Sequence, residues 1–250
     1  MQRYFIKSDL LLDDIVLIKG EDVHHLMNVM RARVGERVIV CCEMKSYITE
    51  MIQLSKTEVH LRIVETKEEK VEMPVFVTIA QGVIKGDKFD WVVQKATECG
   101  ADGFIPIAMK RSVAKLDATK GTKKVMRWQK IALEAARQSH RQKVPVVNAP
   151  INLKELIEMA AEYDVCMFAY EIQEADKRHH LAQIIEKLSF GMRVLILIGP
   201  EGGIDEEEAR LLTEAGFEKV GLGPRILRTE TAPIYVMSAI SYGLEIERRF

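Results

Sequence analysis

The feature that most constrains the fold is an apolar run that ends in a glycine loop. Residues 194–198 are all aliphatic, and Gly199-Pro200-Glu201-Gly202-Gly203 follows directly. A short apolar run closed by glycine and proline is typical of a strand covered on both faces, as in a parallel sheet. Asp205 and Glu208 then form a capping-box pattern, which predicts a helix start. Strand, loop and helix N-terminus in this order favour a small-ligand site, although an ordinary strand–helix turn has the same pattern.

The chain beyond residue 73 alternates between strand and helix patterns, which predicts an α/β fold with a mainly parallel sheet flanked by helices. The expected strands are Val75–Ala80, Gly103–Ala108, Val144–Asn148, Val165–Tyr170, Val194–Ile198 and Lys219–Leu222. The expected helices are Asp87–Glu98, Thr119–Ser139, Leu153–Ala161, Leu181–Leu188, Asp205–Ala215 and Ile234–Ile246.

The first 72 residues have a different pattern, made of short β-branched runs. It predicts strands at Tyr4–Ile6, Ile15–Ile18, Arg37–Cys42, Tyr47–Leu54 and Val59–Val64. One helix is expected within 22–30. These elements indicate a small β-barrel or curled sheet. The charged stretch 65–72, ended by Pro74, predicts a domain boundary near Met73, and hence domains 1–72 and 73–250.

Composition excludes several classes of protein. With 250 residues and 48% hydrophobic content, the chain can bury a full core. Its four cysteines have no C-x-x-C spacing and its histidine pairs have no metal-ligand spacing, so we expect neither disulfides nor a metal. The apolar runs are too short for a signal peptide or a membrane span. We therefore expect a cytoplasmic protein with no membrane partner. The four cysteines are Cys41, Cys42, Cys99 and Cys166, and the histidine pairs are His24-His25 and His179-His180.

A basic segment runs from Lys110 to Lys143. It holds eleven Lys or Arg against Asp117 and Glu134, in a chain of net charge −1. Such a cluster favours contacts with RNA phosphates, although a solvated surface has the same composition. The candidate contacts are Arg111, Lys115, Lys120, Lys123, Lys124, Arg127, Arg137, Arg141 and Lys143.

A second chemistry-bearing stretch precedes the last helix. Thr231 and Pro233 are typical of a helix start, and Arg228 and Glu230 stand just before it. These two residues are either catalytic groups or a plain ion pair. The neighbouring Gly221-Leu222-Gly223 lacks the third glycine of a dinucleotide fingerprint, and no P-loop is present.

Several motifs taken together are more specific than any one of them, and through them the sequence resembles the RsmE family of 16S rRNA uridine N3-methyltransferases, members of the SPOUT superfamily. The resemblance covers nearly the whole chain. The motifs are Arg3-Tyr4-Phe5, His25-Leu26 with Val29-Met30-Arg31, Gln94-Lys95-Ala96-Thr97-Glu98, Arg111-Ser112, Trp128-Gln129-Lys130-Ile131, Ile198 to Gly203 and Leu222 to Ala232.

The resemblance implies a trefoil-knotted SPOUT domain preceded by a PUA-like RNA-binding β-barrel. It also implies S-adenosylmethionine as the methyl donor and no metal. Gly202 and Gly203 are then expected to be small so that the backbone can approach the cofactor. The implied cofactor-binding residues are Tyr170, Glu171, Ile198, Gly199, Pro200, Glu201, Gly202, Gly203, Leu222, Gly223, Ile226, Leu227 and Arg228.

The implied reaction is methylation at N3 of uridine 1498, in helix 44 near the decoding site of 16S rRNA in the small ribosomal subunit. Arg228 and Arg3 are expected to stabilise negative charge on the uracil oxygens. Glu230 is the candidate base, although water or hydroxide serves equally and Glu230 also suits a helix cap. Arg31 and Arg33 are expected to contact RNA.

The resemblance further implies a homodimer formed through the knotted domain. The hydrophobic C-terminal helix suits either that interface or the core. Two other functions stay open at this point. One is another SPOUT reaction, such as ribose 2′-O-methylation, and the other is a ribosome-assembly protein that binds RNA without catalysis.

Overall fold

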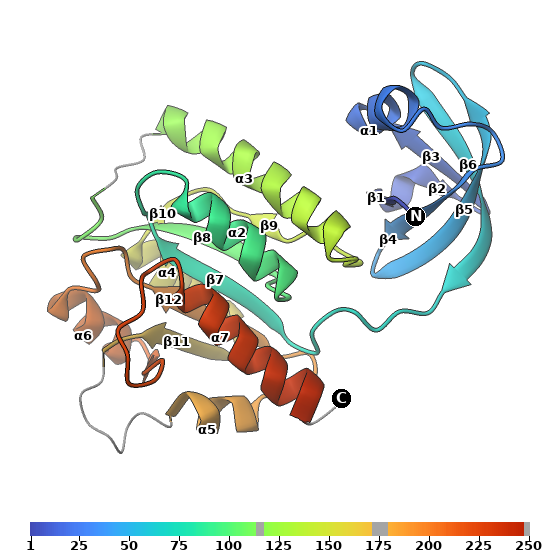
Figure 1. Cartoon of the computed structure of the whole chain (residues 1–250). Helices are drawn as coiled ribbons and strands as arrows, with labels where there is room; N and C mark the ends of the chain where they lie inside the picture. The colour runs from blue at the N-terminus through green and yellow to red at the C-terminus, as the bar shows by residue number, and fades with distance from the viewer. Residues whose placement is uncertain (114–117, 172–179, 248–250) are drawn as a thin grey trace. The chain divides into compact units, whose positions relative to one another are not determined.

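The computed structural model describes residues 1–113, 118–171 and 180–247, with the side chains of 118–120 left aside (Figure 1). Contacts divide the chain into two compact units. The first contains Met1–Glu72 and Ala136–Val144, and the second contains Met73–Ala135 and Pro145–Phe250. The sequence patterns placed all of 73–250 in one domain and did not indicate that 136–144 belongs with the N-terminal unit.

The first unit is built on a six-stranded sheet in the order β1-β4-β5-β6-β3-β2. β1 pairs in parallel with β4, and every other pair is antiparallel. The helix α1 (Glu21–His24) and a wider turn at His25–Val29 bury Val23 and Leu26 in the core of this unit. The expected N-terminal β domain is confirmed. The strands are β1 (Arg3–Phe5), β2 (Leu11–Leu12), β3 (Ile15–Lys19), β4 (Arg37–Cys42), β5 (Lys45–Leu54) and β6 (Glu58–Lys67).

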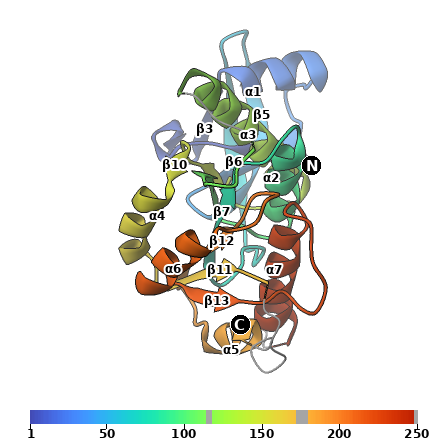
Figure 2. The same cartoon turned by 90° about the vertical axis from the view of Figure 1, so that its left-hand side faces the viewer.

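The second unit contains a seven-stranded parallel sheet in the order β10-β8-β7-β12-β11-β13, with β9 also paired to β8. Figure 2 shows α4 and α6 on one side of this sheet and α2 and α7 on the other. The expected α/β class is therefore confirmed. The strands are β7 (Phe76–Gly82), β8 (Gly103–Ala108), β9 (Val146–Val147), β10 (Ile151–Asn152), β11 (Val165–Ala169), β12 (Arg193–Ile198) and β13 (Glu218–Val220). The helices are α2 (Lys88–Glu98), α3 (Ala118–Gln138), α4 (Leu153–Met159), α5 (His180–Lys187), α6 (Glu206–Glu214) and α7 (Ala232–Ser241).

The aliphatic run 194–198 forms most of strand β12. It lies between β7 and β11, and residues 194–198 are at most 2% exposed. Helices on both faces remove the solvent-facing side that would otherwise require polar residues at every second position. None of the helices in the described part of the chain is long and apolar enough to cross a membrane.

Within the predicted strand Val144–Asn148 only β9 forms, and a second short strand, β10, begins beyond it. The two strands pair with different parts of β8. Pro150 separates them, and a proline cannot donate to a strand ladder. The interruption therefore follows from the missing N–H group.

A buried ion-pair cluster connects 136–144 to the sheet of the first unit. Arg3 is 2% exposed and donates to both carboxylate oxygens of Glu69, at 2.9 and 3.0 Å, and to the carbonyl oxygen of Arg141 at 3.2 Å. Arg141 is itself 3% exposed and pairs with Glu72 at 2.6 Å. Burial opposes ionisation of Glu69, but hydrogen bonds from Arg3 and Lys67 outweigh it and lower the pKa of Glu69 to about 2.

Replacing Glu69 by Gln is expected to lower the free energy of unfolding of the first unit by about 3 kcal/mol, because a buried guanidinium loses its counter-charge. Because the pKa of Glu69 is lower in the folded state, its stabilising contribution is present above about pH 4.5 and is lost as the pH falls toward about 2. The variant should lack this pH dependence. Urea unfolding followed by far-UV circular dichroism measures the effect, while fluorescence of Trp91 and Trp128 reports the second unit separately.

The control is Glu50→Gln in the same sheet, where Glu50 forms an exposed pair with Arg37 at 3.3 Å. An exposed pair contributes at most about 1 kcal/mol. Equal losses in the two variants would contradict the role assigned to the buried pair.

Candidate functional site

The candidate site lies at the carboxyl-terminal edge of the second sheet. Because β7, β12, β11 and β13 are parallel, the segments that follow them all leave the sheet at this edge. In open α/β sheets this edge is where ligands bind. The residues that begin these segments are Val83, Gly199, Tyr170 and Gly221.

A buried amide ties three of the segments at this edge together. Gln81 is fully buried, and its Nε2 donates to Thr229 Oγ1 at 2.9 Å and to the carbonyl oxygen of Gly199 at 3.3 Å. The Thr229 hydroxyl in turn donates to the same Gly199 carbonyl at 2.5 Å. Among the described residues, Gln81 Oε1 has no hydrogen-bond partner although it is buried. The amide therefore anchors both glycine-rich segments and keeps one acceptor unused.

Two glycines allow the backbone of the loop after β12 to pack closely. A Cβ atom on Gly82 would lie 2.5 Å from the backbone nitrogen of Pro200, and one on Gly199 would lie 2.8 Å from the side chain of Ile204. Both separations are shorter than non-bonded heavy atoms adopt, so any side chain would push the loop away from β7. These glycines are required by packing within the chain.

Packing and backbone conformation within the chain account for the glycines at positions 202 and 203. A Cβ atom on Gly202 would lie 2.9 Å from Cβ of Arg111 and 3.0 Å from its carbonyl oxygen. Gly203 has a φ of +73°, a conformation that favours glycine. Internal packing and backbone conformation therefore already require glycine at both positions, and the prediction that they are small to admit the cofactor stays a prediction.

The N-terminus of α6 is capped by its own carboxylates. Asp205 and Glu208 form the predicted capping box, and Glu208 also accepts a hydrogen bond from the backbone of Lys110 at 2.8 Å. Arg111, a predicted RNA contact, donates to Asp205 at 3.2 Å and to the carbonyl oxygen of Gly202 at 3.4 Å. Arg111 therefore positions the glycine loop in this structure, and the helix N-terminus is already satisfied.

An open pocket of about 540 Å³ lies beside the glycine segments. One wall comes from the start of α2 and the other from the loop before α7. Both predicted catalytic residues of this unit, Arg228 and Glu230, line it. Its lining residues are Asp87, Lys88, Trp91, Arg228, Glu230 and Thr231.

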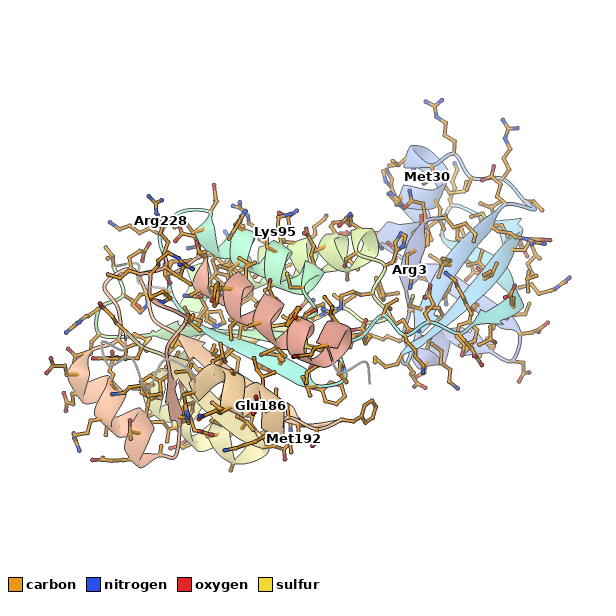
Figure 3. The ribbon with its side chains drawn as sticks, turned by 60° about the horizontal axis from the view of Figure 1, so that its bottom comes forward. Arg3, Met30, Lys95, Glu186, Met192 and Arg228 are labelled. Carbon is orange, nitrogen blue, oxygen red and sulfur yellow. The ribbon has the colours of Figure 1, made fainter. Side chains whose placement is uncertain are left out.

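In this pocket Glu230 pairs with a lysine and not with Arg228. Glu230 pairs with Lys88 at 3.4 Å, and Lys88 also lies 3.8 Å from Glu201 of the glycine loop. The side chain of Arg228 is exposed (Figure 3). Its guanidinium forms no ion pair or hydrogen bond with any described residue. A plain Arg228–Glu230 ion pair is therefore ruled out, and Arg228 has its full hydrogen-bonding capacity available.

The remaining residues predicted to bind the cofactor differ in their exposure to solvent. Leu222, Gly223 and Leu227 are half-buried along the segment before Thr229. Ile198 is 2% exposed within β12, whereas Ile226 is 83% exposed and so forms no apolar wall here.

The end of β11 also reaches this edge. Tyr170 donates its backbone N–H to Val220 at 2.9 Å, and its ring packs edge-on against Phe168. Glu171 follows it and is exposed.

Three arginines predicted to act on RNA are occupied within the first unit. Arg3 and Arg141 are buried in the ion-pair cluster, and Arg137 pairs with Asp22 at 2.5 Å and lies over the Tyr4 ring. A buried, paired guanidinium cannot reach a phosphate without losing its partner. In this structure the three arginines stabilise the first unit, a role that the charge of the segment alone could not reveal.

Other basic residues remain accessible. Arg31, Arg33 and Lys123 are exposed and form no ion pair with a described residue, and Lys124 lies over the Trp128 ring at 5.8 Å. Arg127 is exposed but paired with Asp87 and Asp90. Lys115 lies outside the described residues, as does the side chain of Lys120.

Sequence reasoning missed Gln81, Lys88 and Trp91. The spacing of Lys88 and Trp91 places them on one face of a helix, a signal that the sequence did contain. A polar residue at the end of an apolar strand was the signal for Gln81. No group of three or more potential metal ligands occurs among the described residues, and the four cysteines are free thiols.

Comparison with known proteins agrees with this architecture. Residues 71–241 match the family model described as an RNA methyltransferase domain, and residues 18–64 match an RNA methyltransferase PUA domain. The ribosomal RNA small subunit methyltransferase E of Bacillus subtilis (strain 168) is 44% identical over 256 residues, covering 99% of each chain. The protein of the same name from Aquifex aeolicus (strain VF5) is 32% identical, covering 90% of this chain and 93% of its own.

A solved structure agrees as well. The ribosomal RNA small subunit methyltransferase E from Neisseria gonorrhoeae, bound to S-adenosyl methionine, is 29% identical with a TM-score of 0.81, covering 96% of this chain and 97% of its own. With both domains matched and one relative 44% identical over nearly the full length, the chain belongs to the RNA methyltransferase family of the ribosomal RNA small subunit methyltransferases E.

Proposed function

We propose that this protein transfers a methyl group from S-adenosylmethionine to N3 of a uridine in 16S rRNA of the small ribosomal subunit, at the position 1498 that the resemblance implies. The observation that carries the proposal is the pocket in which Arg228 and Glu230 lie next to the glycine segments. An unpaired arginine and a carboxylate in one pocket are suited to a reaction that builds negative charge and releases a proton.

The residues at the sheet edge fit the proposed cofactor. Gln81 Oε1 is an unused buried acceptor, and the loops 199–203 and 222–227 add backbone groups. Leu222 and Leu227 offer apolar surface for an adenine. S-adenosylmethionine, when bound, supplies a methyl group on a positively charged sulfur that keeps the electron pair of the broken bond.

The protein must orient the uracil and accept its N3 proton. Glu230, which pairs with Lys88, takes that proton as the N3–methyl bond forms. Arg228 stabilises the negative charge that spreads onto the uracil oxygens. Orientation supplies up to roughly 7–11 kcal/mol of such a barrier, and a positioned base about 10²–10⁴-fold in rate.

We propose that accessible cations guide the RNA to this pocket. Arg31 and Arg33 of the first unit and Lys123 and Lys124 of α3 are the candidates, since each lacks a carboxylate partner among the described residues. Binding should weaken steeply with salt because each phosphate contact releases counterions. Affinity for small subunits that is independent of salt would contradict this.

We also propose a homodimer and a cytoplasmic location. Tyr235, Tyr242 and Ile246 are 38%, 57% and 61% exposed along one stripe of α7 and the turns after it, which suits an interface with a second copy. A monomer in sedimentation equilibrium would contradict the dimer. Four free cysteines suit a reducing compartment.

The direct test is nucleoside analysis of 16S rRNA after incubation of small subunits with protein and isotope-labelled S-adenosylmethionine. Subunits from a strain without this modification should acquire labelled 3-methyluridine. Labelled 2′-O-methyluridine would favour the ribose reaction. Failure to bind the cofactor in calorimetry, with no labelled product, would favour a non-catalytic RNA-binding protein.

Replacing Arg228 by Ala should lower the rate of methyl transfer about 10²–10³-fold, because the developing charge loses its donor. Cofactor binding should remain measurable by isothermal titration calorimetry. Arg225→Ala is the matched control, since Arg225 is an exposed arginine of the same loop that does not line the pocket. Equal rates in the two variants would remove Arg228 from the mechanism.

Replacing Gly82 by Ala should weaken S-adenosylmethionine binding at least about tenfold, since relieving a 2.5 Å contact with Pro200 displaces the loop after β12. Calorimetry measures the affinity, and thermal unfolding establishes that the variant is folded. Gly121→Ala serves as the control, because there the new Cβ would lie at an ordinary 3.5 Å from Pro150. Wild-type affinity in Gly82→Ala would show that the loop position does not govern cofactor binding.

A further inference from the structure

We propose that the pocket between α2 and the loop before α7 receives the target uracil as a base turned out of the RNA, with Trp91 as its stacking surface and Lys88 as a reader of its edge. This inference rests on the proposed function and extends it to how the base is recognised. Lys88 and Trp91 have no role in the reaction as derived from Arg228 and Glu230 alone, apart from the Lys88 ion pair.

Trp91 offers an aromatic face that the other tryptophan does not. It is 42% exposed and lines the pocket, three residues after Lys88 on the first turns of α2. Trp128 is 3% exposed, packs against Phe89 with ring centroids 4.1 Å apart, and donates to Asp90 at 2.9 Å. The second tryptophan is thus part of the core, whereas the first presents its indole to the pocket.

The polar groups of the pocket match the hydrogen-bonding edge of uracil. That edge presents an acceptor, a donor and an acceptor: O4, N3–H and O2. The pocket presents two cationic donors, Lys88 and Arg228, and two carboxylates, Glu230 and Asp87. Asp87 already accepts from Arg127 at 3.1 Å, so Glu230 is the carboxylate with an acceptor to spare. Cytosine has a lone pair at N3 and an amino group beside it, so Glu230 would face a lone pair and one cation would face a donor. The pocket therefore discriminates in favour of uracil.

Two groups that line the pocket, the Glu230 carboxylate and the Arg228 guanidinium, can form further hydrogen bonds. Glu230 Oε2 is buried and accepts no hydrogen bond within the described part of the chain, with Lys88 Nζ 3.4 Å away, beyond a normal hydrogen bond. The guanidinium of Arg228 has no partner among the described residues. An incoming base would satisfy groups that are now incompletely paired. The open volume of about 540 Å³ lies in the usual range for small-molecule sites.

A turned-out base follows from the chemistry of N3. In a paired or stacked uridine this nitrogen is enclosed by its neighbours, so the enzyme must extrude the nucleotide and replace the lost stacking. An indole is the side chain best suited to that replacement, because stacking on an aromatic surface is favourable for every base. Lys88 also lies 3.8 Å from Glu201, so it connects the base pocket with the glycine loop.

The test combines protein variants with RNA variants. Reconstituted small subunits would carry uridine, cytidine or an abasic nucleotide at the methylated position, and their affinity for the protein would be measured by competition binding. For uridine subunits, Trp91→Ala should weaken binding about tenfold or more, and Trp91→Phe should restore most of the loss. For abasic subunits, Trp91→Ala should make no difference. A merely structural role would weaken binding to both kinds of subunit equally, and that result would overturn the proposal.

Lys88→Met tests whether Lys88 recognises the hydrogen-bonding edge of the uracil. It should reduce the preference of the protein for uridine over cytidine subunits while leaving affinity for abasic subunits unchanged. Gln94→Ala is the matched control, because Gln94 is an exposed residue of α2 that does not line the pocket. A wild-type preference in Lys88→Met would remove Lys88 from base recognition.

Failure of this inference is distinguishable from failure of the proposed function. If the wild-type protein forms no 3-methyluridine, the proposed reaction is wrong. If the wild-type protein forms 3-methyluridine, but Trp91→Ala binds uridine subunits as the wild type does, only the proposal that this pocket receives the uracil is wrong. Calorimetric affinity for S-adenosylmethionine, expected to be unchanged in Trp91→Ala, shows in either case that the cofactor loops are intact.

Discussion

The hydrogen bonds that Gln81 and Thr229 make with Gly199 are the interaction on which the site depends. They join the end of β7 to the loop after β12 and to the segment before α7, which lie 118 and 148 residues further along the chain. Because Gln81 is fully buried, water does not compete for these bonds. Close backbone packing at Gly82 and Gly199 completes the junction, so the site geometry follows from contacts that no bound molecule has to create.

Charge pairing separates structural arginines from those available for function. Arg3, Arg137 and Arg141 are held by carboxylates in the first unit, where they stabilise the attachment of 136–144 to the sheet. Arg228 lies in an open pocket without a partner among described residues, while Lys88 takes the neighbouring carboxylate. A buried charge needs a partner, whereas an exposed unpaired one keeps its donors for a ligand. Pairing is thus a better guide to function here than the position of an arginine in a basic segment.

Much of the fold and part of the site could be predicted from residue patterns. The alternation beyond residue 73 predicted the parallel sheet, and the capping box at Asp205 and Glu208 formed as expected. The pairing of Arg228 with Glu230 was left open, and the structure gives Lys88 as the partner. Trp91 and Lys88 were missed because their significance depends on the loop before α7, which reaches the start of α2 only in the folded chain. The close contact of Gly202 with Arg111 could not be predicted, because it joins segments about ninety residues apart.

The sequence by itself determined the strand and helix order, the glycine loops, the motifs of the methyltransferase family and the candidates Arg228 and Glu230. These depend on local periodicity, turn preferences and residue type, which are properties of short stretches of chain. Only the tertiary structure decided which arginines are buried, which carboxylate Lys88 pairs with and which tryptophan faces a pocket. Those outcomes depend on contacts between distant segments, and the free energy of a charge or an aromatic ring changes with the neighbours that such contacts supply.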